Sequence, residues 1–76
     1  KDAYLLYMNH WEFYAFLVNN SEIDNKNIKK YFEDNFISGT DLFFNKYPDY
    51  LTKEHLFKEI KTLLKEIVHE PKIIND

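Results

Sequence analysis

The chain has 76 residues, no cysteine and a net charge of -3, and 45% of its residues are hydrophobic and 18% aromatic. This apolar content excludes an intrinsically disordered chain, and the lack of cysteine excludes disulfide bridges and thiolate metal sites. The charge is spread evenly and provides no basic face, which argues against nucleic acid as a partner. No apolar run approaches the roughly 18 residues that a membrane span needs, so we expect no span within these residues.

The first helix is predicted over residues 2–18, and its apolar side chains cover more than one side. At about 100° per residue, one side of this helix carries Tyr4, Tyr7, Met8, Trp11, Ala15 and Val18. A second side carries Leu5, Phe13 and Phe16. Because a helix that is apolar nearly all round packs on two sides, we expect this second side to contact a missing segment, a second copy of the chain or a partner.

Two polar residues, His10 and Glu12, lie within this apolar helix, where an unpaired charge would be costly. One interpretation is a buried polar site that contacts a partner. The simpler interpretation is that each side chain lies at a solvated edge of the helix, or that Glu12 accepts hydrogen bonds from a Tyr or Lys of a neighbouring element. We favour the simpler interpretation, and both stay open at this point.

The second helix is predicted over residues 25–46, with Asp24 as its N-cap and with Ile23 and Ile28 forming a hydrophobic staple. The helix must end before Pro48, because proline disfavours helical geometry at the residue that precedes it. An apolar stripe along one side of this segment predicts that it packs against the first helix.

Two further features of the second helix concern its packing. Gly39 is the only glycine of the chain and lies within the apolar stripe. Glycine costs about 1 kcal/mol of helix propensity relative to alanine, so its presence predicts a close helix contact or a kink. Ile37 and Phe44 point away from the stripe. We therefore expect Phe44 to be exposed and to extend the apolar surface formed by the second side of the first helix.

The third helix is predicted over residues 53–69, with Thr52 as its N-cap, Leu51 and Leu56 as a staple, and Pro71 beyond its end. Its apolar residues recur at helical spacing on a single side. The opposite side mixes Glu and Lys, which is typical of a solvated surface. This pattern therefore predicts an amphipathic helix with one buried side.

Catalytic and metal-binding patterns are weak in this chain. Neither serine has a histidine near it in the sequence, and one glycine cannot form a phosphate-binding loop. Glu66 and His69 have the Glu-x-x-His spacing of di-iron bundles, and His55 and Glu59 are four residues apart, but a di-iron site needs further inward-facing carboxylates. We therefore expect no enzyme activity, no metal and no cofactor.

Part of the chain resembles a known family. Residues 8–18 run Met-Asn-His-Trp-Glu-Phe-Tyr-Ala-Phe-Leu-Val, followed by Ile23 and Asp24 and then by a helix that contains Tyr31 and Phe32. This order resembles an uncharacterised family of bacterial proteins, a domain of unknown function in which a short transmembrane stretch precedes a helical cytosolic domain. The resemblance supplies no activity, because the family has none assigned.

The resemblance covers residues 5–45, with weaker agreement through the third helix. The positions that match the family pattern are Asn9, Trp11, Glu12 and Asp24. Family members often have glycine after the first helix, whereas residues 19–21 read Asn-Asn-Ser here, so this turn is expected to differ. The resemblance implies a bacterial origin and a membrane anchor upstream of Lys1.

These patterns predict an all-α fold, a three-helix up-down-up bundle in which the first helix packs against the other two. We expect residues 1–76 to form one domain. Because the chain starts at Lys1 and is helical almost at once, we also expect it to be a piece of a longer protein.

The predicted function is that of a non-catalytic, cytoplasmic interaction or oligomerisation module, which binds a protein partner or a second copy of itself. The residues expected at the interface are Leu5, Phe13, Phe16 and Phe44. The alternative is a small regulatory or inhibitor protein, from a phage or a bacterial defence system, that docks onto an enzyme.

Overall fold

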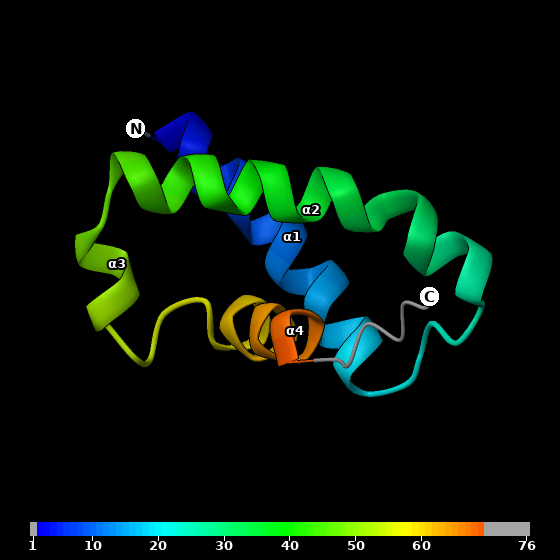
Figure 1. The fold of residues 1–76 in the computed structure, drawn as a ribbon. Coiled ribbons are helices and arrows are strands. Elements are labelled where there is room, and N and C mark those ends of the chain that lie inside the picture. Colours follow the sequence, from blue (N-terminus) through cyan, green and yellow to red (C-terminus); the bar gives the residue numbers. More distant parts are fainter. Residues whose placement is uncertain (1, 70–76) are drawn as a thin grey trace.

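The computed structural model describes residues 2–69 and contains helices and connecting segments, with no strand in that range (Figure 1). In chain order the helices are α1 (Asp2–Asn19), α2 (Lys26–Lys46), α3 (Asp49–Thr52) and α4 (Lys58–His69). The predicted all-α class is confirmed. The short helix α3 was not predicted, and the described part of the chain therefore has four helices rather than three.

The start of α2 is built by a local cap. The Oδ1 atom of Asn25 accepts hydrogen bonds from the backbone N–H groups of Asn27 at 2.9 Å and Ile28 at 3.2 Å. The N-cap is thus Asn25, and the prediction of Asp24 was wrong by one residue, because the side chain one position later reaches these amides.

The end of α2 lies where the sequence predicted it. Its last residue is Lys46, and the N–H group of Tyr47 closes the final turn by donating to the carbonyl of Phe43 at 2.8 Å. Pro48 follows and cannot extend the helix.

The predicted helix over residues 53–69 is shorter in the structure, because α4 begins only at Lys58. Thr52 is not its N-cap. The Thr52 hydroxyl instead donates to the carbonyl of Asp49 at 2.9 Å, within α3. Phe57, directly before α4, has a φ of 55°, which is uncommon for a residue with a bulky side chain. Its ring lies 5.7 Å from that of Phe43, so aromatic packing offsets part of this backbone cost.

Helix α1 is the central element, and both α2 and α4 pack on it. In Figure 1, α2 lies across the view, α4 is seen nearly end-on, and α1 runs behind both. The expectation that the first helix packs against the other two long helices is confirmed. An up-down-up bundle would also set α2 against α4, whereas within residues 2–69 these two helices barely touch each other.

The core lies where the helices meet on α1. Its buried side chains are Met8, Ala15, Phe36, Thr40, Phe43, Phe44, Ile60 and Leu63. Rings of α1 surround Phe36 edge-on or tilted, with centroid distances of 5.5 Å from Trp11 and 5.7 Å from Tyr14. The one buried polar side chain among the described residues, Thr40, donates to the carbonyl of Phe36 at 2.7 Å and so carries no desolvation penalty.

Gly39 of α2 lies directly against the side chain of Tyr7 of α1. A Cβ atom placed on Gly39 would overlap the hydroxyl of Tyr7. The prediction that this glycine permits a close helix contact is therefore confirmed.

Candidate interaction surface

The side of α1 turned away from α2 and α4 exposes large apolar side chains. Phe13 is 62% exposed and Phe16 is 44% exposed, as expected for side chains on the second apolar side of this helix. Leu6, which the sequence pattern did not single out, is 61% exposed. We call these three residues the outer face of α1.

The outer face of α1 lies on a helix that exposes almost no charge. Between Ala3 and Asn20, with histidine counted as neutral, Glu12 is the only residue with a formal charge. Its carboxylate is turned toward α4 rather than outward. The polar side chains that remain exposed on this stretch, Asn9, His10 and Asn20, are uncharged or counted as such. Surfaces that meet partners are rich in aromatic residues and poor in charge, and this surface has both properties.

Phe44 does not belong to this surface. It is 4% exposed and lies in the core beside Phe43, with their ring centroids 5.6 Å apart. The expectation that Phe44 adds to a leftover apolar surface was therefore wrong. The reason is that Tyr47, Tyr50 and Phe57, from the segment after α2, pack against the same cluster and bury a wider arc of α2 than one stripe.

Leu5 is half-buried and packs against the core cluster, so its expected place on an exposed surface was also wrong. Leu5 lies two helical turns before Glu12, and residues at this spacing share one side of a helix. Glu12 faces α4, and Leu5 therefore lies toward the interior as well. Leu6, one position later, points outward in its place.

Glu12 binds the first turn of α4. Its Oε2 accepts a hydrogen bond from the N–H group of Glu59 at 3.0 Å, and its Oε1 accepts one from the N–H group of Ile60 at 3.0 Å. The simpler interpretation of Glu12, an internal hydrogen-bond acceptor, is confirmed. The donors, however, are backbone amides of a distant helix rather than a Tyr or Lys side chain.

Asn19, the last residue of α1, strengthens the same contact. Its Nδ2 donates to the carbonyl of Glu59 at 3.0 Å and to the Glu59 carboxylate at 2.9 Å. A carboxylate at a helix N-terminus also complements the helix dipole. The inner side of α1 thus holds α4 through side-chain bonds, which leaves the outer face of α1 without a structural role inside this chain.

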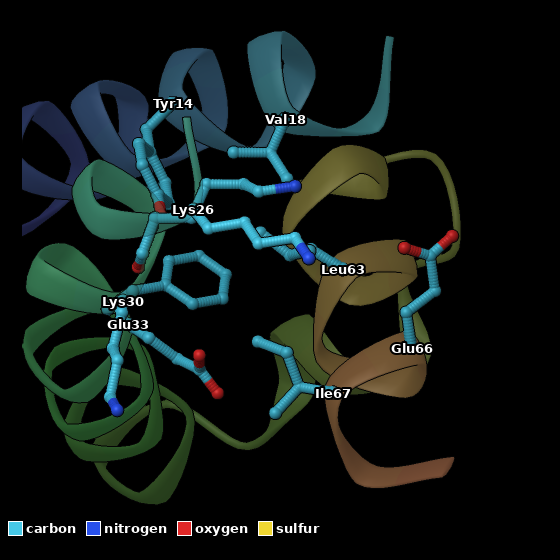
Figure 2. Close-up of a pocket in the computed structure, with 10 residues that line it drawn as sticks. Tyr14, Val18, Lys26, Lys30, Glu33, Leu63, Glu66 and Ile67 are labelled. Carbon is cyan, nitrogen blue, oxygen red and sulfur yellow. The ribbon is translucent and has the colours of Figure 1, made fainter. Parts of the chain in front are cut away.

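A groove of about 830 Å³ opens between α2 and α4 over α1 (Figure 2). Its apolar lining comes from all three helices and consists of Tyr14, Val18, Phe36, Leu63 and Ile67. Its charged lining consists of Lys26, Lys29, Lys30, Glu33 and Glu66. The groove exists because α2 and α4 pack on α1 but not on each other.

Tyr14 forms part of the groove wall near the first turn of α2. Its hydroxyl donates to the carbonyl of Lys29 at 3.5 Å, a long and therefore weak hydrogen bond. Burial raises the pKa of Tyr14 above its ordinary value of 10.0, and the negative charge of Glu33 is a second, smaller cause of the same shift. The phenol consequently stays neutral at physiological pH.

Among the side chains that the structure describes, those of residues 3–68, no group of three or more His, Asp or Glu is placed to hold a metal ion. The side chain of His69, which the Glu-x-x-His spacing pairs with Glu66, lies outside the described part. Among the helices that the structure describes, none has the length and apolarity required to cross a bilayer.

Comparison with protein-family models, with curated proteins and with solved structures finds no match to this chain. Function is therefore inferred from the residues and geometry of the chain itself.

Proposed function

We propose that this chain is a non-catalytic helical module that associates through the outer face of α1. The observation that carries the proposal is the exposure of Leu6, Phe13 and Phe16 on a stretch of α1, residues 3–19, whose one formal charge, Glu12, is bonded to α4. Scattered apolar residues are ordinary on protein surfaces, but apolar side chains gathered on one uncharged helix face are typical of an interface.

The occupant that we favour is a second copy of the chain. A two-fold interface brings the same surface of both subunits together, so a charge near the symmetry axis would face its own copy. The outer face of α1 has no charged residue, and Asn9, which lies one helical turn from both Leu6 and Phe13, offers a donor and an acceptor between them. The helix has 18 residues and is about 27 Å long, which limits the buried area. We therefore expect a weak, concentration-dependent dimer.

Sedimentation equilibrium over a wide concentration range tests this proposal, with Leu6→Glu as the disrupting variant. Leu42→Glu is the matched control, because Leu42 is a similarly exposed leucine, at 65%, on α2. We expect the wild-type chain and Leu42→Glu to dimerise alike, and Leu6→Glu to raise the dissociation constant about tenfold or more.

Two results would contradict self-association through the outer face of α1: a chain that stays monomeric at all concentrations, or a dimer that Leu6→Glu leaves intact. A strict monomer would favour the alternative function, in which a small regulatory protein docks the same face onto an enzyme. A dimer that depends on Leu42 but not on Leu6 would place the interface on α2.

The proposal also covers the organism from which the chain comes and the compartment in which it works. The resemblance over residues 5–45 supports a bacterial protein whose helical part works in the cytoplasm. Sequencing of the full reading frame would test it, because members of that family typically have a short transmembrane stretch before the helical domain.

A further inference from the structure

The groove between α2 and α4 is a second surface, separate from the outer face of α1. Its floor and walls, formed by Tyr14, Phe36, Leu63 and Ile67, are apolar. Helix pairs that splay apart over a third helix leave the kind of trough into which an amphipathic helix can lay its apolar side. The volume of about 830 Å³ lies within the range of recognised binding sites, roughly 300 to 1,000 Å³.

The charges along the α2 wall are arranged by sign. Figure 2 shows the Lys26 side chain extending over the groove toward Val18 and Leu63, whereas Lys30 points away from it. Glu33 points into the groove. The positive and negative ends, Lys26 and Glu33, are separated by about 10 Å along α2, since each helical residue rises 1.5 Å.

The positive end of the groove lies at the N-terminus of α2. The first turn of α2 contains no acidic residue, and Lys26 and Lys29 place their charges near the positive end of the helix dipole. A carboxylate from a bound molecule would relieve this repulsion. At the other end, Glu33 would repel a purely anionic ligand and attract a cation.

We propose that this groove binds an amphipathic helix of a partner protein that carries an acidic residue and a basic residue about two turns apart. Its apolar side packs on Phe36, Leu63 and Ile67, its carboxylate lies against Lys26 and Lys29, and its basic side chain lies against Glu33. Such a helix matches both the apolar lining and the order of charges, whereas a single-headed anionic amphiphile matches only the lysine end.

Fluorescence anisotropy with three synthetic helical peptides tests this proposal on the 76-residue chain. The three peptides share one apolar side and differ only at two positions that lie seven residues apart. The first peptide has Glu and Lys at these positions, the second has Glu at both, and the third has Lys at both. We expect the Glu and Lys peptide to bind most tightly and the Lys and Lys peptide most weakly. A single charge pair at a solvated site changes affinity by up to roughly fivefold.

The Glu33→Lys variant makes the test independent of the particular peptide sequence. It should reverse the preference in favour of the Glu and Glu peptide, by about fivefold or more in the ratio of dissociation constants. Ile67→Glu, which places a charge in the apolar wall, should weaken the binding of all three peptides. Far-UV circular dichroism establishes that each variant keeps its helix content.

Phe13→Asp separates this proposal from the proposed function. It changes the outer face of α1 and should abolish dimerisation without altering peptide binding. The groove proposal is overturned if the three peptides bind equally, if none binds, if Glu33→Lys leaves the preference unchanged, or if oleate binds while the peptides do not.

Discussion

The N-termini of α2 and α4 are held in two different ways. Helix α2 is capped by its own neighbour, Asn25, whose side chain bonds amides two and three residues later. Helix α4 has its first amides bonded by Glu12, which lies 47 residues before Glu59 in the chain. A cap of the first kind forms with the helix itself, whereas a cap of the second kind exists only when α1 is already in place.

This difference makes α4 dependent on α1. With 12 residues, α4 is of a length at which isolated helices are marginal in water. Its apolar side packs on α1, and its N-terminus is bonded by Glu12 and Asn19 of the same helix. We therefore expect α2 to retain some helical tendency alone and α4 to lose its structure when its contact with α1 is removed.

Removing the distant cap should have the largest effect. Glu12→Ala leaves the amides of Glu59 and Ile60 without their charged acceptor, and should lower the free energy of unfolding by about 2–3 kcal/mol. Urea denaturation measures the loss. Glu22→Ala, at an exposed position, is the matched control and should change stability by less than about 0.5 kcal/mol. Equal effects of the two variants would show that the bonds to α4 contribute nothing.

Removing the local cap should have a smaller effect, confined to α2. Asn25→Ala should lower the free energy of unfolding by about 1 kcal/mol, the usual value for a lost N-cap. The neighbouring variant Asp24→Ala should stay within about 0.5 kcal/mol, because Asn25 holds the cap. Amide hydrogen exchange should then accelerate at Asn27 and Ile28 but not in α4. A larger loss from Asp24→Ala than from Asn25→Ala would contradict the assigned cap.

The smallest effect is expected where α1 meets the start of α2. The pKa of Tyr14 is raised in the folded chain by burial and by Glu33. Its contribution to stability is therefore fully present below the ordinary pKa of 10.0 and is lost as the pH rises through the raised value. Between pH 8 and pH 11, the urea midpoint of the wild-type chain should fall more than that of Tyr14→Phe. Parallel curves would contradict this linkage.

Local chemistry explains what could be predicted from the sequence. Pro48 ends α2 by its own geometry, Gly39 marks a close contact because no other residue lacks a Cβ, and helical spacing places Phe13 and Phe16 apart from Met8 and Ala15. Each of these inferences depends on residues within a few positions of one another. The all-α class follows from the same periodicity.

What the sequence could not predict depends on distant contacts. Thr52 has the chemistry of an N-cap, but α4 begins later because Glu12 bonds the amides of Glu59 and Ile60. No local signal pairs these positions. The burial of Phe44 similarly depends on the path of the chain after α2. Leu5 was misplaced for the same reason: its helical position is correct, but which side of α1 faces α4 is decided by Glu12.

We propose that the two sides of α1 have separate roles: the inner side holds α4, and the outer face binds a second copy. A dilution series of amide nitrogen–proton NMR spectra tests both parts at once. We predict concentration-dependent shifts at Leu6, His10 and Phe13, with the amides of Glu59 and Ile60 unchanged. Spectra that do not change with concentration, or shifts that map to α2 and α4 instead, would contradict it.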